Sequence, residues 1–155
     1  MAKSFDFIHG TNEILISKGI ELPLEGQSTT NPDTRMEKGL NIQKEIVGAE
    51  AIDKMYDNSP ESQIHIRKYL SANCFGDYYT RNGLDIKTRE LLTFAMLIAM
   101  GGCEPQAKGH IMANLNVGND KQLLLSVVTN LLPYIGYPRT LSAISYLNEM
   151  IPESQ

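Results

Sequence analysis

The chain has 155 residues with a formal net charge of −4, and hydrophobic residues make up 42% of it. This length favours one domain with a core of its own, and the acidic balance excludes the basic surplus typical of nucleic-acid-binding proteins. The longest apolar run, LLTFAMLIAM, is shorter than the roughly 20 residues that a membrane-spanning helix needs. Because the chain has only two cysteines and an N-terminus unlike a signal peptide, we expect a reduced, cytoplasmic protein without a membrane or nucleic-acid partner.

Residues 1–32 differ in composition from the rest of the chain. They hold short apolar patches such as FDFIHG and a connector, ELPLEGQSTTNPD, rich in residues that favour turns and loops. Two interpretations stay open for this region: a loosely ordered arm, or a segment that packs on a neighbouring subunit. We therefore separate an N-terminal arm, residues 1–32, from a helical domain, residues 33–155.

From Asp33 onward the hydrophobic spacing is helical, and no stretch sustains the alternation of a strand. A first helix is expected to end at Gly48, and a short second helix to follow over residues 49–58. Ser59 and Pro60 are residue types that favour the N-cap and the first helical position, which predicts a helix that opens at this point.

The next part of the chain predicts two helices separated by glycines. Asp85 is expected to cap residues 86–100, which end at Gly101-Gly102. Glu104-Pro105 then restarts a helix, because proline is favoured at the first helical position. Gly118 is expected to terminate it.

Asn119 and Gln122 have the types of a capping pair for the following helix, and a last helix is expected to begin near Tyr137-Pro138. The whole pattern predicts an all-α fold, a single-domain helical bundle. Two of its stretches, residues 91–100 and 123–132, are apolar nearly all the way round. Since a helix without a polar face is normally surrounded by protein, we expect a homo-oligomer.

Cys103 and His110 are seven residues apart, about two helical turns, so both side chains are expected on one helix face. Cys103 precedes the helix start, where unpaired N–H groups stabilise a thiolate, but it is equally a small apolar side chain between helices. Gln106 stands where a C-x-x-C pair would place its second cysteine. We expect Cys103 and His110 to form two walls of one inter-helix pocket.

His110 is the better catalytic candidate of the two, because imidazole titrates near neutral pH. A metal site is disfavoured, since zinc takes three or four ligands and the chain has no H-x-x-x-H or E-x-x-H spacing. The sequence also lacks phosphate-binding glycine loops, nucleophile elbows and dinucleotide fingerprints. We expect no metal and no cofactor, and chemistry on a small-molecule substrate by the protein's own side chains.

Charged residues near the helix that Asp85 caps are candidates for a substrate site. The stretch TRELL places Arg89 and Glu90 in the first turn after the Asp85 cap, where a glutamate complements the helix dipole, and this is a sufficient structural explanation for Glu90. Arg89 is disfavoured by that dipole and could pair with Glu90, with Asp85 or with a bound anion. Arg81 and Arg139 are further candidates for binding a carboxylate.

Residues 76–138 carry a set of motifs: GLDIKTRELL, GGCEPQAKGH, NVG before a capped helix, and Y-x-G-x-P at Tyr134, Gly136 and Pro138. In this order and spacing the motifs resemble the carboxymuconolactone decarboxylase family, which includes the alkylhydroperoxidase D-like proteins. The resemblance covers residues 35–150 and leaves the arm outside. It implies an all-helical fold assembled as a homotrimer or homohexamer.

The decarboxylase branch of this family is cofactor-free and acts on a small carboxylated lactone. There His110 matches the family's active-site histidine, which donates or accepts a proton, while Arg81 or Arg89 could orient the carboxylate. Gln106 and Tyr134 lie on the matching motifs and are further candidates for substrate binding. This branch therefore implies acid–base decarboxylation as the first hypothesis for the function.

The peroxidase branch uses a C-x-x-C pair, a histidine and an upstream glutamate. Cys103 and His110 match the first cysteine and the histidine, and Glu90 lies near the position of the glutamate. Gln106 replaces the second cysteine, which in that branch attacks peroxide. A peroxiredoxin-type antioxidant activity through Cys103 alone, with an external thiol as reductant, is the second hypothesis. A non-catalytic, ligand-binding member of the fold is the third.

Overall fold

Every regular element of the chain is a helix in the computed structural model, which describes residues 2–152. The helices are α1 (Ala2–Ser17), α2 (Arg35–Val47), α3 (Ala49–Asp57), the short 3₁₀ helix η1 (Glu61–Gln63), α4 (Ile64–Tyr69), the π-helix η2 (Leu70–Tyr79), α5 (Ile86–Met100), α6 (Glu104–Asn116) and α7 (Lys121–Met150). The predicted all-α class is confirmed. None of the helices in residues 2–152 is long and apolar enough to cross a membrane.

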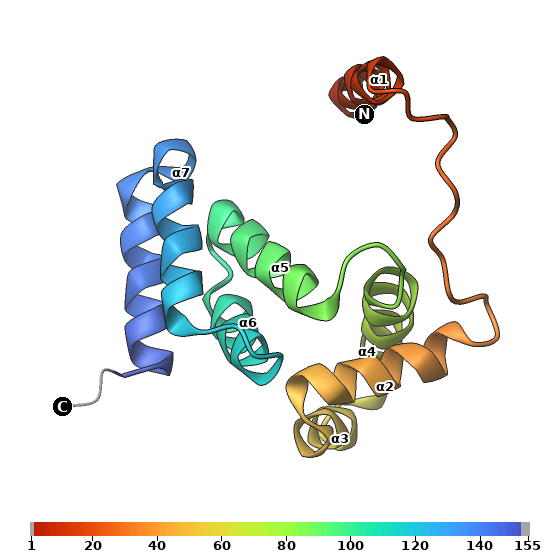
Figure 1. Ribbon diagram of the computed structural model, residues 1–155. Coiled ribbons are helices and arrows are strands. Elements are labelled where there is room, and N and C mark those ends of the chain that lie inside the picture. The colour runs from red at the N-terminus through yellow and green to blue at the C-terminus, as the bar shows by residue number, and fades with distance from the viewer. Residues whose placement is uncertain (1, 153–155) are drawn as a thin grey trace.

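Helix α1 lies apart from the other helices, at the end of an extended segment formed by residues 18–34 (Figure 1). The arm thus contains a regular helix, and the two interpretations of this region, a loosely ordered arm or a segment that packs on a neighbouring subunit, stay predictions. The end of the segment is attached to η2, because Thr29 and Thr30 donate side-chain hydrogen bonds to the carbonyl oxygens of Thr80 and Gly76. The division of the chain at residue 32 stays a prediction.

Helix α2 packs along η2 with their backbones in direct contact. A Cβ atom on Gly39 would collide with the carbonyl oxygen of Ser71, and one on Gly76 would collide with that of Arg35. Beside this contact, the buried hydroxyl of Ser71 donates to Gln43 Oε1 at 2.5 Å. Two glycines, one on each element, therefore set the distance between α2 and η2.

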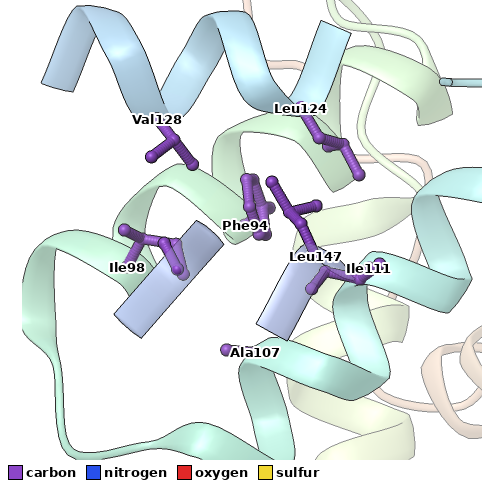
Figure 2. Packing of buried hydrophobic residues seen from close by; sticks show 8 residues of the cluster. Phe94, Ile98, Ala107, Ile111, Leu124, Val128 and Leu147 are labelled. Carbon is purple, nitrogen blue, oxygen red and sulfur yellow. The ribbon is translucent and has the colours of Figure 1, made fainter. Parts of the chain in front are cut away.

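Helices α5, α6 and α7 pack pairwise around the larger hydrophobic core (Figure 2). The side chain of Phe94 points from α5 into the middle of this cluster, against residues of α6 and α7. The fully or nearly fully buried members are Phe94, Ile98, Ala107, Ile111, Leu124, Val128, Ala143 and Leu147. This packing fixes α6 against α5, and the candidate site lies on these two helices.

Helix α7 consists of two helical limbs that run side by side in opposite directions (Figure 1). The chain turns at Gly136, whose backbone is non-helical with φ 75° and ψ 169°, a conformation that glycine adopts at little cost. The second limb starts around Pro138, and Thr140 donates its hydroxyl to the Gly136 carbonyl at 3.0 Å. The predicted break between two helices at Tyr137-Pro138 is confirmed.

Most of the expected helix ends are confirmed, and two are wrong. Asp85 caps α5 by accepting a hydrogen bond from the Thr88 amide at 2.8 Å, and α2 and α5 end at Gly48 and Gly101. Ser59 does not cap a helix; its hydroxyl donates to the Met55 carbonyl, and the chain first forms η1 before α4 begins.

The second correction concerns the start of α7. Its N-cap is Asp120, which accepts a hydrogen bond from the Leu123 amide at 2.8 Å, and not the expected pair of Asn119 and Gln122. Asn119 is instead buried, and its side-chain amide donates to Asn114 and to the Lys87 carbonyl. The sequence offered two adjacent residues of capping type, and the buried hydrogen bonds of Asn119 decided between them.

One face of α5 carries large apolar side chains that no described residue covers. Leu92, Met96 and Met100, spaced four residues apart, are 47%, 62% and 63% exposed. They lie on the side of α5 opposite to Phe94 and Ile98, which are buried in the core. The helix is therefore apolar on both sides, and only one side is packed within the subunit.

The contact of α2 with η2 predicts unequal effects of two glycine substitutions. Gly76→Ala should lower the free energy of unfolding by about 2–3 kcal/mol, because the new methyl group must displace the α2 backbone. Gly109→Ala, in α6 with open space around its Cβ position, should raise it by about 0.5–1 kcal/mol through helix propensity. Urea unfolding of both variants measures this, and equal stability changes would show that the two backbones can separate freely.

Candidate functional site

A buried carboxylate and a partly exposed imidazole meet between α5 and α6. Glu90 has no exposed surface, and its Oε2 lies 2.7 Å from Nδ1 of His110. The His110 side chain remains 24% exposed. The pair therefore joins an ionisable group in the interior to a ring that solvent and small molecules can reach.

The position of Glu90 differs from the expectation based on the helix dipole. Helix α5 begins at Ile86, so Glu90 lies beyond the first turn and no acidic residue occupies that turn. Burying a carboxylate is costly unless a charged or hydrogen-bonding partner compensates it. His110 is that partner, and the dipole does not explain Glu90.

The side chain of Asn114 connects the backbones of the two paired residues, Glu90 on α5 and His110 on α6. Its side-chain amide donates to the carbonyl oxygens of Glu90 at 3.1 Å and His110 at 2.7 Å, and its Oδ1 accepts from Asn119 at 2.8 Å. Asn114 is fully buried. The sequence interpretation missed this residue, although an asparagine four residues after His110, hence on the same helix face, was the available signal.

Tyr79, also missed from sequence, contributes a hydroxyl beside α5. Thr93 donates to the Arg89 carbonyl at 2.9 Å, so in the 2.6 Å contact between the two hydroxyls Tyr79 is the donor and Thr93 the acceptor. Burial, and next the nearby negative charge of Glu90, raises the pKa of Tyr79 above its usual range. Tyr79 therefore stays a neutral hydrogen-bond donor.

The other carboxylate oxygen of Glu90 is unusual. Within residues 2–152, Oε1 is buried and has no hydrogen-bond partner. Most buried polar atoms in proteins are paired, so this unpaired oxygen is an energetic cost that packing alone does not explain. A carboxylate kept in such a position beside a histidine suits a pair that takes part in proton transfer.

Cys103 does not share a pocket with His110. It is the N-cap residue of α6, and its thiol donates to the Leu97 carbonyl at 3.2 Å. Cys103 lines a cavity on the side of α5 and α6 that faces the second limb of α7, and His110 is not among the lining residues. The expectation of one pocket with Cys103 and His110 as its walls is wrong, because the two side chains turn toward different neighbours.

The other candidate residues are dispersed. Arg89 donates three hydrogen bonds to the carbonyl oxygens of Arg81, Asn82 and Leu84, and so fixes the loop before α5. The Arg81 side chain, in contrast, forms no hydrogen bond or ion pair with the described residues. Gln106 is exposed on α6, and Tyr134 is 85% exposed near the turn of α7.

No group of three or more His, Cys, Asp or Glu side chains that could hold a metal ion occurs in the described part of the chain. Both cysteines are free thiols. Cys74 lies on η2, and burial followed by the negative charge of Glu90 raises the pKa of its thiol. The environment of Cys74 therefore keeps this thiol protonated and weakly nucleophilic.

The raised pKa of Cys74 predicts slow alkylation. In a Cys103→Ser variant, where Cys74 is the one thiol left, iodoacetamide should react more slowly at pH 8 than with a free cysteine peptide, because a higher pKa leaves less thiolate. The pH midpoint of the alkylation rate, followed by mass spectrometry, should lie above that of the peptide. Adding Glu90→Gln should move this midpoint down, and a midpoint at or below that of the peptide would contradict the assigned environment.

Comparison with known proteins agrees with the motifs on α5, α6 and α7. Residues 65–149, more than half of the chain, match the carboxymuconolactone decarboxylase family. The chain is also 26% identical over 123 residues to the 4-carboxymuconolactone decarboxylase of Acinetobacter baylyi, a match that covers 79% of this chain and 91% of that protein. The matched segment includes Glu90, His110 and Asn114. The chain belongs to the carboxymuconolactone decarboxylase family.

Proposed function

We propose that the protein is a cofactor-independent decarboxylase of a small carboxylated lactone such as 4-carboxymuconolactone. The observation that carries this proposal is the 2.7 Å contact of His110 Nδ1 with a fully buried Glu90. When Nδ1 donates to Glu90, the ring is oriented and Nε2 is the atom that exchanges a proton with a substrate. The name of the Acinetobacter relative and the family match support the same reaction class.

The chemistry needs one proton for each carbon dioxide released. When the bond between carbon and carboxylate breaks, its electron pair moves into the conjugated lactone carbonyl, and a carbon atom of the product must then be protonated. The doubly protonated ring of His110 donates from Nε2, while the Glu90 carboxylate faces the positive charge of the ring before transfer. The partly exposed ring regains its proton from solvent.

Arg81 is the proposed partner of the substrate carboxylate. The bonds from Arg89 to the loop carbonyls hold the Arg81 backbone beside the start of α5, and the Arg81 guanidinium has no partner among residues 2–152. A guanidinium matches a carboxylate in geometry and charge. Arg89 already uses Nε and Nη2 on backbone carbonyls, and we assign it the role of positioning Arg81.

The decarboxylase proposal predicts that activity depends on His110 and not on a thiol. His110→Gln should lower kcat for lactone decarboxylation by about 10²–10⁴-fold, the usual contribution of general acid–base catalysis. Cys103→Ser should keep the wild-type rate, because its thiol faces the separate cavity. Carbon dioxide release and lactone disappearance, measured together, provide the readout.

Two outcomes of this assay would support the other hypotheses. Peroxide turnover that requires Cys103 and proceeds without lactone decarboxylation would favour the thiol peroxidase. Absence of both activities, together with a ligand that raises Tm, would favour a binding protein.

Glu90→Gln is the matched test of the Glu90–His110 pair, because it keeps the shape of the Glu90 side chain and removes its charge.

We also propose that the subunits assemble as a homotrimer or homohexamer through the exposed face of α5. Leu92, Met96 and Met100 form an apolar stripe on a helix whose opposite side is already buried. Exposed apolar patches of this kind mark protein–protein contacts. The α5 faces of neighbouring copies of this chain, which meet around a three-fold axis, are the occupants proposed here.

Met96→Glu should therefore dissociate the oligomer, because a charge at the centre of an apolar interface is left without a partner. Light scattering coupled to size-exclusion chromatography gives the mass of the assembly. Ile66→Glu, at a similarly exposed aliphatic residue on α4, is the control and should leave the mass unchanged. A monomeric wild type, or dissociation by the control alone, would contradict this assignment of the interface.

A further inference from the structure

The cavity beside Cys103 is separate from the Glu90–His110 pair and has features of a binding site. It measures about 150 Å³ and lies where the end of α5, the start of α6 and the second limb of α7 meet. Its walls are mostly apolar, and the residues are Leu97, Ile98, Gly101, Gly102, Cys103, Glu104, Ala107, Pro138, Arg139, Ser142 and Tyr146. An apolar cavity of about 150 Å³ can hold one benzene-sized molecule.

Arg139 brings a positive charge to the edge of this cavity. Its side chain lies directly against Gly101: a Cβ atom on that glycine would come within 2.9 Å of Arg139 Nε. Gly101 also has a φ of 70°, a conformation that other residues adopt only with strain. Both the backbone of Gly101 and its missing side chain thus make room for the guanidinium.

The charge of Arg139 is not compensated within the subunit. In the part of the chain that the structure describes, the Arg139 side chain has no hydrogen bond and no ion pair. Glu104 is the one carboxylate that lines the cavity, and it pairs with Lys108 at 2.7 Å, which in turn contacts Glu149 at 2.6 Å. Arg139 is therefore the one cationic side chain that lines the cavity, and no carboxylate of the described residues pairs with it.

A purely structural role explains this arrangement only in part. A cation near the C-terminal end of α5 complements the helix dipole, but the guanidinium of Arg139, an exposed residue, carries five N–H donors that no acceptor of residues 2–152 meets and that are open to solvent or to a bound molecule. The thiol of Cys103 cannot serve as one, since it is itself a donor to Leu97. An acceptor that fits both the charge and the fork-shaped donors of Arg139 is a carboxylate.

We propose that this cavity binds a small monocarboxylate whose apolar part is about one ring in size. The carboxylate is bound by Arg139, and the ring lies among Leu97, Ala107 and Tyr146. This inference is independent of the proposed decarboxylation, because His110 does not line the cavity. The site is a second one, at the opposite end of the α5–α6 contact from the loop that Arg89 holds.

Benzoate is a suitable probe, with benzyl alcohol as the neutral compound of similar shape. Titration calorimetry on the wild-type protein should show saturable benzoate binding and weak or no binding of benzyl alcohol. Arg139→Gln should weaken benzoate binding about 10–100-fold, the loss expected for a hydrogen bond to a charged group. In amide NMR spectra, benzoate should shift the signals of Gly101 and Gly102.

Three further variants keep the test independent of folding and of the catalytic proposal. Ser142→Phe places a ring into the cavity from an exposed position on α7 and should abolish benzoate binding while far-ultraviolet circular dichroism stays unchanged. His110→Gln should bind benzoate as the wild type does. Arg81→Gln, which removes a cation outside the cavity, is the matched control and should also keep the affinity.

The proposal is overturned if benzoate fails to bind, or if Arg139→Gln lowers Tm without changing the affinity, which would leave Arg139 with its structural role alone. It is equally overturned if binding is lost in His110→Gln or Arg81→Gln and retained in Arg139→Gln. In that case the carboxylate occupies the catalytic site, and the decarboxylase proposal would stand without the second site. If the wild-type protein binds benzoate as expected but does not decarboxylate the lactone, the second site would stand without the decarboxylase proposal.

Discussion

The contact of a fully buried carboxylate with a half-buried imidazole is the constraint on which the α5–α6 arrangement depends. Glu90 is 0% exposed, and removing one partner from a buried charge pair costs about 3–5 kcal/mol. A well-packed apolar pair would be as stable or more stable in the same place. The pair is therefore better explained by what His110 does with it than by stability. Asn114 uses both side-chain amide hydrogen bonds that it donates to hold the backbones of Glu90 and His110 in register.

The surroundings of this pair separate its role from that of the thiols. The negative charge of Glu90 raises the pKa of both Tyr79 and Cys74, in each case after burial as the larger cause. These groups are thereby kept neutral, so the Glu90–His110 pair is the ionisable unit in this part of the interior. Cys103, which the sequence aligned with His110, donates to Leu97 and borders a different space.

Much of the fold could be predicted from local signals, whereas the site could not be completed from them. Asp85 and Gly48 act within one helical turn, and their roles as cap and terminator follow from residue type and position. The pairing of Glu90 with His110 depends on how α5 crosses α6, which the spacing along one helix does not contain. For the same reason the periodicity placed Cys103 with His110: residues seven apart share a helix face, but a side chain at the N-cap turns with the loop and not with the helix.

The Y-x-G-x-P segment, one of the motifs by which the sequence resembles its family, forms the turn between the two limbs of α7. Gly136 reverses the chain with a φ of 75°, and Pro138 opens the second limb of α7 directly afterwards. The residue that follows, Arg139, is thereby carried back against Gly101, at the end of α5. The two positive-φ glycines, 35 positions apart in sequence, thus act on the same arginine: one directs the chain that carries it, and the other leaves the space that it fills. Tyr134, on the other side of the turn, is exposed, so within the subunit the segment acts through the backbone geometry of Gly136 and Pro138.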